Sequence, residues 1–208
     1  MIAYSIDAAQ KASVFDEIIV STDDEEIAAI AQALGASVPF LRPSELADDY
    51  TGTLPVIAHT VRAYESQVHT IDFACCIYAT APFLKPEFLR KGLQVLTQQL
   101  EAEFAFSVTS YAFPVFRALR IAGTGFVEMF WPENEAKRSQ DLPQAWHDAG
   151  QFYWGRREAF LTRDGVFNAR ALPVSLPRHL VQDIDTIEDW DRAERMFRAW
   201  GHPDAPQP

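Results

Sequence analysis

The sequence predicts an α/β fold in which a mostly parallel sheet carries helices on both faces. Strand-type apolar runs at 17–21, 73–78 and 104–109 alternate with amphipathic helical patterns. No tight hairpin signal joins one run to the next, so the connections are expected to cross over and the strands to pair in parallel. Of the 208 residues, 48% are apolar and 23% are charged, as in ordinary globular proteins. We therefore expect one domain over residues 1–208, with ligands bound outside the carboxyl ends of its strands.

The elements of the first half follow from hydrophobic spacing and capping residues. The chain begins inside a helical pattern over residues 1–14, which leads into the strand-type run 17–21. Thr22 and Glu25 have the T-x-x-E spacing of a capping box, and Gly35 ends the helix that they begin. After a loop, we expect a helix over 53–67, a strand over 73–78, a helix over 86–100 and a strand over 104–109.

Residues 111–151 differ in character from the rest of the chain. Short aromatic pieces alternate there with Pro and Gly, which predicts small strands and an arm rather than βαβ units. Their aromatic side chains are either additional core or an association surface, where aromatic residues are enriched. Beyond this arm we expect strands over 152–154, 171–175 and 181–184, and helices over 157–161 and 187–200.

Charge and composition exclude several classes of protein. The net charge of -11 opposes nonspecific binding to nucleic acid and to anionic lipid. No apolar run reaches the length of a membrane span, and the first residues lack a signal-peptide pattern, so we expect a cytoplasmic location. Cys75 and Cys76 are neighbours in an apolar run, which indicates reduced core thiols. The histidines have no zinc-ligand spacing, and no serine-hydrolase motif occurs.

The sharpest candidate site is a pair of aspartates, Asp183 and Asp185, in the segment 182–186. Residues two apart on a strand point to the same face, so both carboxylates would converge at a strand end, where Mg²⁺ binds through oxygen. The spacing of Asp185 and Glu188 also suits a helix cap, with Asp183 as a solvated neighbour. The spacing alone leaves both interpretations open.

Two loops and one basic pair are further candidates for ligand binding. The turn with Thr22 and Asp23 follows a strand-type run, where it either contacts a ligand or only caps the next helix. Arg42 and Thr53 flank a loop ahead of a helix N-terminus, a position that suits phosphate or carboxylate, although such residues are often a solvated Arg and a simple cap. Arg138 belongs to one of the densest basic points, which an acidic protein needs in order to hold phosphate.

Six segments follow one another along the chain in a distinctive order. They are MIAYSIDAA (1–9), FDEIIVSTDDEEIAAIAQALGASVPFLRP (15–43), ELADDYTGT (45–53), CCIYATAPF (75–83), DAGQFYWG (148–155) and QDIDTIEDW (182–190). Together they span nearly the whole chain and resemble the acylneuraminate cytidylyltransferases, most closely their pseudaminic acid branch. The resemblance implies a fold like that of nucleotide-diphospho-sugar transferases, with a dimerisation arm that exchanges between the subunits of a homodimer. It also implies that CTP and a nine-carbon 2-keto sugar acid react to give a CMP-sugar and pyrophosphate.

The resemblance also implies roles for individual residues, position by position. Arg42 and Thr53 match residues near the nucleotide, and Asp183 and Asp185 match the paired aspartates that hold Mg²⁺. Arg138 resembles a basic residue that reaches the substrate and takes part in catalysis with the two aspartates. The implied set of substrate-binding residues also includes Thr22, Asp23, Tyr78, Gln151 and Tyr153.

Two departures from the family pattern bear on function. Tyr78 stands where the sialic acid enzymes have Gln, which indicates a different base contact or a different branch. The family opens with a strand and a Gly-rich basic loop for the CTP phosphates, and the sequence begins just after that segment. We therefore expect either a start upstream of Met1 or a truncated product. Three functions stay open: a CMP-sugar synthetase for pseudaminic acid, one for another keto-sugar acid, and a catalytically silent homologue that dimerises and binds sugar acid.

Overall fold

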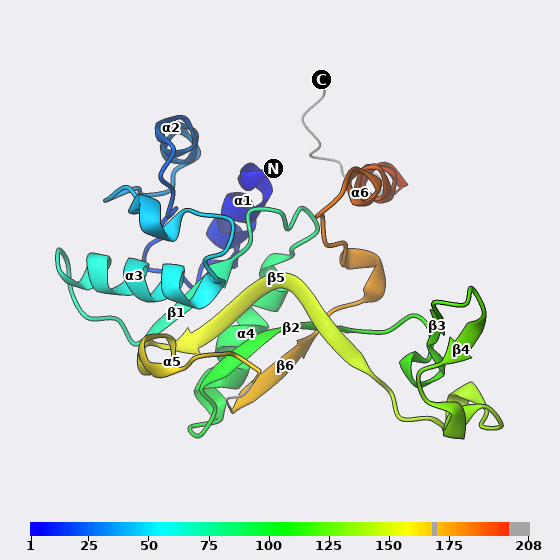
Figure 1. Cartoon of the computed structure of the whole chain (residues 1–208). Helices are drawn as coiled ribbons and strands as arrows, with labels where there is room; N and C mark the ends of the chain where they lie inside the picture. The colour runs from blue at the N-terminus through cyan, green and yellow to red at the C-terminus, as the bar shows by residue number, and fades with distance from the viewer. Residues whose placement is uncertain (168–169, 200–208) are drawn as a thin grey trace.

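A four-stranded sheet forms the centre of the computed structural model, which describes residues 1–167 and 170–199 (Figure 1). Its strands, in spatial order, are β1 (Phe73–Ile77), β5 (Trp146–Arg156), β2 (Phe104–Ser110) and β6 (Ala171–Ser175). β2 and β6 pair in parallel, whereas β5 is antiparallel to both of its neighbours. Three of these strands therefore point the same way, and the predicted α/β fold class is confirmed with one reversed strand inside it.

β5 is reversed because the chain returns to the sheet without a crossover helix. It leaves β2 at Ser110, passes through the arm and re-enters at Trp146, which lies opposite Ser110 in the ladder. β5 is also longer than the predicted strand 152–154, because its first residues pair with the end of β2. The arm thus behaves as a long loop between two antiparallel neighbours.

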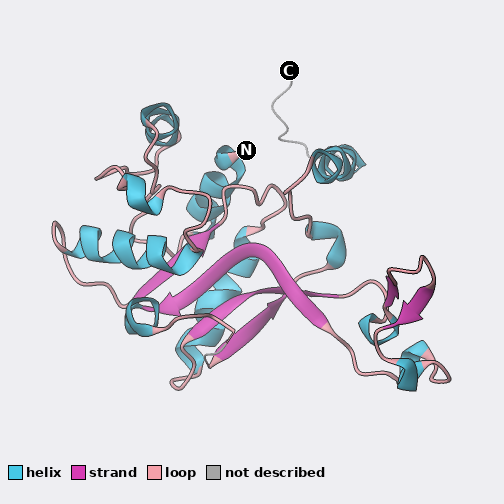
Figure 2. Cartoon of the chain, viewed as in Figure 1, coloured by secondary structure: helices cyan, strands magenta, loops and turns pink. Residues whose placement is uncertain are grey.

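Helices cover both faces of the sheet, as predicted (Figure 2). On one face lie α1 (Ile2–Ala12) and α4 (Pro86–Gln98), and on the other lie α3 (Thr53–Glu65) and α5 (Arg157–Thr162). Leu89 of α4 is fully buried in one core cluster with Phe152 and Trp154 of β5. On the opposite face, the rings of Phe104 and Phe160 meet edge to face, with their centroids 5.2 Å apart. The sheet is thus a buried, rigid layer from which its strand ends project.

α4 approaches β5 closely because Gly92 faces the sheet. A Cβ at this position would lie 2.5 Å from Cδ1 of Trp154 and 2.9 Å from Cε2 of Phe152. The indole of Trp154 also donates a hydrogen bond to the Leu89 carbonyl at 3.0 Å, which satisfies its buried N–H group. These contacts hold the second half of β5 against the helix and leave its first half free to bend.

The predicted strand 17–21 is only an isolated parallel bridge between Ile19 and Ser37. The Ser37 amide donates to the Ile18 carbonyl at 2.8 Å, and the Val20 amide donates to the Ser37 carbonyl at 2.9 Å. Within the described ranges, this segment has no neighbouring strand that extends the single bridge into a ladder. Its apolar residues pack instead with α1 and α2 in a separate small cluster.

The predicted strand 181–184 is also wrong. A 3₁₀ turn at Arg178–Leu180, begun by Pro177, leads the chain out of β6 and into this segment. The segment itself has no ladder in the part of the chain that the structure describes. Its apolar residue Val181 still packs against the main core, which explains the strand-like pattern.

The helix α2 (Glu25–Ala33) has its N-cap at Asp24, two residues after the Thr22 cap that the capping-box pattern predicts. Asp24 is its cap, since Oδ1 accepts hydrogen bonds from the Glu26 amide at 2.7 Å and from the Ile27 amide at 3.0 Å. The predicted cap, Thr22, is buried and accepts only from the Asp24 amide at 3.1 Å. Gly35, at a φ of 86°, ends the helix in the left-handed conformation, as predicted.

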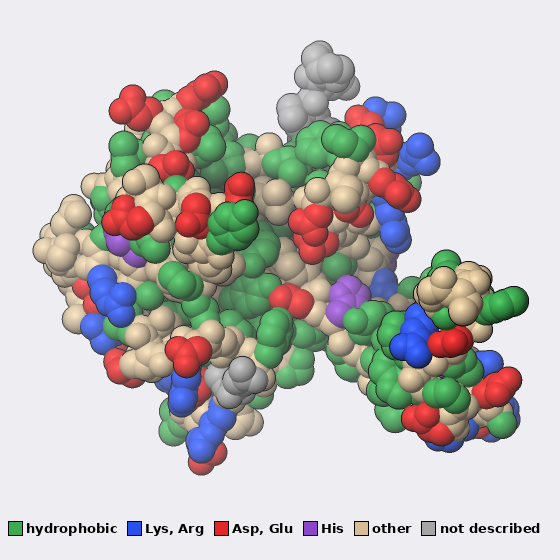
Figure 3. All heavy atoms as spheres, in the orientation of Figure 1, with side chains coloured by type: hydrophobic (Ala, Val, Ile, Leu, Met, Phe, Trp, Pro, Cys, Tyr) green, Lys and Arg blue, Asp and Glu red, His purple; other side chains and the backbone are tan. Residues whose placement is uncertain are grey.

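The arm extends from the body of the molecule around a small hairpin (Figure 1). β3 (Leu119–Ile121) and β4 (Val127–Met129) pair antiparallel, and 3₁₀ turns at Val115–Arg117, Pro132–Asn134 and Ser139–Asp141 surround them. Hydrophobic side chains gather on its surface in Figure 3. Phe113, Ile121 and Phe126 are 82%, 80% and 76% exposed. Of the two roles expected for these apolar residues, association surface fits their exposure and additional core does not.

The last helix, α6 (Ile187–Ala199), agrees with the predicted helix 187–200 up to the end of the described residues, since Trp200 lies outside them. It packs on α1, with the ring centroids of Tyr4 and Phe197 5.3 Å apart. Among the helices of the described residues, none combines the length and the apolar character that crossing a membrane requires.

Candidate active site

A bulge in β5 shapes the candidate site at the carboxyl end of β2. The pairing register of the two strands shifts between Phe106 and Val108. The Ser107 hydroxyl closes the gap by accepting hydrogen bonds from the amides of Gln151 and Phe152, both at 3.2 Å. β5 bends strongly along its length in Figure 1. Bulges of this kind redirect side chains next to functional sites.

Asp148 lies at this bulge and is held by two hydrogen bonds. The Tyr153 hydroxyl donates to Oδ2 of Asp148, and the Gly150 amide donates to Oδ1 at 2.9 Å. Burial of the phenol, and then its hydrogen bond to the Asp148 carboxylate, raise the pKa of Tyr153, so the hydroxyl stays a neutral donor. The sequence pattern singled out neither Asp148 nor Ser107, because their contacts at the bulge have no spacing signature.

Asp183 lies against the same turn. A Cβ built on Gly150 would be 3.5 Å from Oδ1 and 3.7 Å from Oδ2 of Asp183. Much of the Asp183 residue reaches solvent, yet partial burial and then the carboxylate of Asp185 raise its pKa, with a smaller contribution from Asp148. Within residues 1–167 and 170–199, no Lys or Arg forms an ion pair with any of these carboxylates. The site therefore concentrates uncompensated negative charge.

Asp185 is not the cap of α6, so that interpretation of the aspartate pair is wrong. Thr186 and Asp189 form the cap instead: the Asp189 amide donates to Thr186 Oγ1 at 3.2 Å, and the Thr186 amide donates to Asp189 Oδ2 at 3.0 Å. This reciprocal pair is a capping box. It leaves the carboxylates of Asp183 and Asp185 outside the helix cap.

The donor set of Asp183 and Asp185 fits a hard divalent cation that is shared with a substrate. Within the described residues, no group of three or more His, Cys, Asp or Glu side chains could hold a metal ion. Mg²⁺ is commonly bound by one or two carboxylates together with water and substrate phosphates. A bound cation would also offset the like-charge repulsion that raises the pKa of Asp183.

Tyr78 links β1 and α3 to the bulge. Its hydroxyl lies 3.0 Å from Oγ1 of Thr53, and its ring centroid lies 5.5 Å from that of Tyr153. Gly52 occupies the N-cap position of α3, so the Thr53 hydroxyl is not used as a cap. The structure therefore brings Tyr78, Thr53 and Tyr153 together in one polar group.

Gln151, three residues after Asp148 in the bulge, is almost fully buried. Its Nε2 atom donates to the Leu180 carbonyl at 2.5 Å, at the start of the segment that leads to Asp183. Its Oε1 atom has no hydrogen-bond partner among the described residues. A buried acceptor without a donor is costly, so a donor from outside the described residues would stabilise this oxygen.

Arg42, Asp23 and Thr22 form a second group. Nη2 of Arg42 lies 3.3 Å from Oδ1 of Asp23, and the Arg42 amide donates to the Thr22 carbonyl at 2.8 Å. The Nε atom of Arg42 is buried and has no partner in the described ranges. No hydrogen bond or ion pair within those ranges links this group to Asp148 or Asp183. The predicted residues thus divide between two parts of the fold.

Arg138 is not brought to the carboxylates of its own chain. It lies in the arm, where it pairs with Asp141 through two hydrogen bonds of 2.7 Å and 2.8 Å. Its side chain is 71% exposed. In Figure 1 the arm that carries it extends away from the body.

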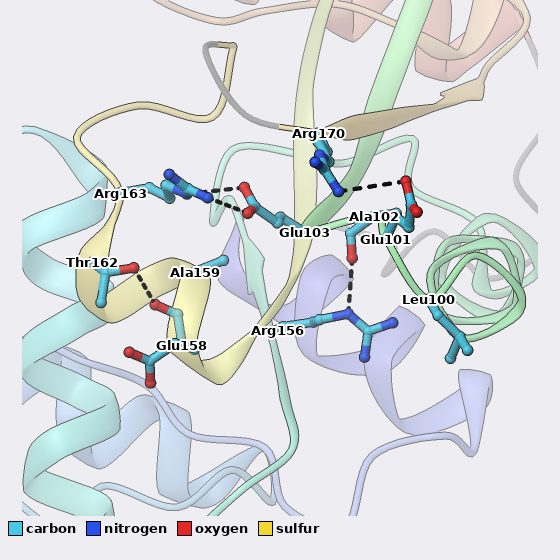
Figure 4. Close-up of a pocket in the computed structure, with 10 residues that line it drawn as sticks. All are labelled: Leu100, Glu101, Ala102, Glu103, Arg156, Glu158, Ala159, Thr162, Arg163 and Arg170. Atoms are coloured by element: carbon cyan, nitrogen blue, oxygen red, sulfur yellow. Dashed lines mark hydrogen bonds and ion pairs between the residues drawn. The ribbon is translucent and has the colours of Figure 1, made fainter.

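A separate cavity of about 340 Å³ lies away from this site, next to the amino ends of β2 and β6 (Figure 4). Its charged side chains are already paired, Arg163 with Glu103 and Arg170 with Glu101. Arg156 also lines it and donates to the Ala102 carbonyl at 2.8 Å. This cavity shares no residue with the carboxylate group at the bulge, so it is not the candidate site.

A family model and two relatives carry cytidylyltransferase in their names. The family model described as Cytidylyltransferase matches residues 1–196. The pseudaminic acid cytidylyltransferase of Campylobacter jejuni subsp. jejuni is 38% identical over 198 residues, which cover 95% of this chain and 85% of that protein. The Helicobacter pylori pseudaminic acid cytidylyltransferase and UDP-2,4-diacetamido-2,4,6-trideoxy-beta-L-altropyranose hydrolase is 30% identical over 184 residues, which cover 88% of this chain and 35% of that protein.

Solved structures share the fold. CMP:2-keto-3-deoxy-manno-octonic acid synthetase, complexed with CTP, has a TM-score of 0.67 at 14% identity, over 96% of this chain and 88% of that one. The 4-diphosphocytidyl-2C-methyl-D-erythritol synthase of Anaerococcus prevotii has a TM-score of 0.61 at 14% identity, over 95% of this chain and 88% of that one. At such identities the likeness is one of fold alone. The family model, however, covers residues 1–196, and the chain accordingly belongs to the cytidylyltransferase family.

Proposed function

We propose that the protein transfers CMP from CTP to a nine-carbon 2-keto sugar acid, with pseudaminic acid as the acceptor, and releases pyrophosphate. The 38% identity to a relative named as a pseudaminic acid cytidylyltransferase, over 95% of the chain, supports the donor and the acceptor. The structural observation that carries the proposal is the position of Asp183 against Gly150 at the β5 bulge. Asp185 is close enough to raise the pKa of Asp183, and the bulge also contains the buried, unpartnered Oε1 atom of Gln151.

The reaction is an in-line displacement at the α-phosphorus of CTP. The anomeric hydroxyl of the sugar acid gives up its proton to solvent as its oxygen bonds to the α-phosphorus, and the bond between this phosphorus and the pyrophosphate oxygen breaks. We assign Asp183 and Asp185 to hold Mg²⁺, because their carboxylates are hard oxygen ligands without a Lys or Arg partner in the described ranges. The ion, when bound, supplies positive charge to the phosphates.

We assign the polar residues of the site to the two substrates. Arg42, with its buried unpartnered Nε atom, would orient the nucleotide together with the turn at Thr22 and Asp23. Tyr78 and Thr53 would contribute their paired hydroxyls to the same substrate. Gln151 and Tyr153, at the bulge, would face the sugar acid.

We further propose a homodimer in which the arm of one subunit reaches the site of the other. Support comes from the exposed apolar side chains of the arm and from the distance in Figure 1 between the arm and the body of its own chain. Arg138 would then act on the substrate held by the partner subunit. A cytoplasmic location remains our expectation, in keeping with the free thiols of Cys75 and Cys76.

One assay separates this function from the two alternatives. Purified protein is incubated with CTP, Mg²⁺ and one acid at a time, namely pseudaminic, legionaminic, sialic or 2-keto-3-deoxy-octonic acid, and both pyrophosphate and the CMP-sugar are measured. Pyrophosphate release with pseudaminic acid supports the proposal. Release only with another acid identifies that acid as the acceptor. No pyrophosphate with any acid favours a catalytically silent binding protein.

A further inference from the structure

We propose that Asp148 is a specificity-determining residue, whose carboxylate accepts a hydrogen bond from a hydroxyl or acylamino N–H group of the acceptor sugar acid. This inference rests on the proposed function, because it names the part of the substrate that the bulge binds. It adds to the site a residue that neither the motif Asp183–Asp185 nor the nucleotide loop contains.

The carboxylate of Asp148 is fixed in place and keeps accepting capacity. The Tyr153 hydroxyl holds one oxygen and the Gly150 amide holds the other at 2.9 Å. A carboxylate oxygen has two lone pairs, so each of these oxygens retains one position for a further donor. The residue is half-buried, and no Lys or Arg in the described ranges forms an ion pair with it.

We assign the free capacity of Asp148 to a substrate rather than to a metal ion. In the part of the chain described, its carboxylate does not form a group of three potential metal ligands with Asp183 and Asp185. The CTP phosphates do not account for this capacity, since a fixed carboxylate repels them. CTP also carries N–H and O–H donors, on its cytosine amino group and its ribose. We place the nucleotide at Arg42, Tyr78 and Thr53, which leaves the hydroxyl and acylamino donors of the sugar acid for the bulge.

A second acceptor in the same bulge points to the same ligand chemistry. Three residues beyond Asp148, the buried Oε1 atom of Gln151 has no donor in the described ranges. The Ser107 hydroxyl accepts hydrogen bonds from the amides of Gln151 and Phe152 and so fixes the backbone that carries this second acceptor. The Asp148 carboxylate and the Gln151 Oε1 atom can both accept further hydrogen bonds, and a sugar with several hydroxyl and acylamino groups can donate them.

The test compares wild type with Asp148→Asn, which keeps the size of the side chain and an oxygen for the Gly150 amide. Steady-state kinetics give kcat and the separate KM values for pseudaminic acid and for CTP, and calorimetry gives the Kd for pseudaminic acid alone. We expect KM and Kd for the acid to rise about 10- to 100-fold, as for loss of a charge-assisted hydrogen bond. We expect KM for CTP and the unfolding temperature to stay close to wild type.

Two further variants separate a binding role from a structural one. Tyr153→Phe removes one of the two donors that fix the carboxylate, so it should raise KM for the acid by less than Asp148→Asn does. Asp7→Asn removes an exposed carboxylate that pairs with Lys11 at 2.9 Å on α1, and it should leave both KM values within about twofold.

Failure of the inference and failure of the proposed function give different results. Unchanged KM and Kd for the acid in Asp148→Asn, with an active wild type, overturn the inference alone. An equal rise in KM for CTP, or a lower unfolding temperature that accounts for the loss, also overturns it. A wild type that binds the acid without releasing pyrophosphate, together with weaker binding in Asp148→Asn, overturns the proposed function and supports the role of Asp148.

Discussion

The backbone of Gly150 lies directly against the carboxylate of Asp183, so that an added Cβ would be 3.5 Å from Oδ1. The glycine is also the residue that turns β5, with a φ of 62°. The turn that redirects the strand and the carboxylate assigned to the metal are therefore in contact. A substitution in this turn is therefore expected to shift the Asp183 carboxylate.

Gly150→Ala should reduce both stability and turnover. A non-glycine residue in the left-handed region costs about 1–2 kcal/mol, and the methyl group would touch the Asp183 carboxylate. Urea unfolding gives the free energy, and pyrophosphate release gives the rate. Gly123→Ala is the matched control, because nothing lies within 4 Å of its Cβ. Equal stability and turnover for the two variants would show that the turn does not depend on glycine.

Asp183→Asn should abolish turnover and slightly stabilise the metal-free protein at neutral pH. The pKa of Asp183 is raised in the folded state, so the folded chain binds its proton more tightly than the unfolded chain does. Stability from this group is therefore present at low pH and is lost as the pH rises through the folded pKa. Removing the charge should raise the unfolding temperature by roughly 1–2 °C in the presence of a chelator, because solvent screens the effect.

The pH dependence provides the check on this prediction. The stabilisation by Asp183→Asn should shrink as the pH falls toward the ordinary range of an Asp side chain, where wild type is protonated as well. Asp164→Asn, at an exposed position, is the control for removal of a surface carboxylate. A variant that is less stable than wild type at neutral pH would contradict the prediction, because it would mean that the folded protein stabilises the ionised Asp183 carboxylate.

Tyr78→Phe and Thr53→Val should each raise the KM for CTP, and their effects should not add. The two hydroxyls lie 3.0 Å apart, so removal of either one breaks the same hydrogen bond. We expect a coupling free energy of about 0.5–1.5 kcal/mol from the double-mutant cycle in kcat/KM. A strictly additive double variant would show that the pair does not act as a unit on the nucleotide.

Charge on the apolar surface of the arm should prevent dimerisation. Ile121→Asp combined with Phe126→Asp places two carboxylates on side chains that are 80% and 76% exposed, so the monomer fold should survive. Sedimentation velocity should then show a monomer where wild type is a dimer. Leu100→Asp, on the body at 83% exposure, should leave the dimer intact. A wild type that sediments as a monomer would contradict the proposal that the arm forms a dimer interface.

The sequence was sufficient to predict elements whose signal is local. The helix α4 follows from Pro86 at its first turn and a clear apolar face, and β2 follows from an apolar run. The direction of β5 was not predictable, because it depends on Trp146 pairing with Ser110 across the whole arm. Segment 17–21 resembles a strand by composition, whereas strand formation requires a neighbour that composition does not reveal.

The candidate site shows the same division between local and long-range signals. The spacing of Asp183 and Asp185 is visible in the sequence, and the capping alternative fails only because Thr186 and Asp189 cap α6 instead. Asp148 enters the site through a bulge and through the Tyr153 hydroxyl, and neither contact has a spacing signature. Residues joined by tertiary hydrogen bonds could therefore be found only in the structure.

The central claim is that the chain, with Mg²⁺, transfers CMP to a sugar acid, and pyrophosphate release tests it most directly. With CTP and pseudaminic acid, the wild type should release pyrophosphate in step with a CMP-sugar, and both should disappear with a chelator or in Asp183→Asn. Pyrophosphate that forms equally well in Asp183→Asn would contradict the assignment of the site. No pyrophosphate from the wild type with any keto-sugar acid would contradict the function itself.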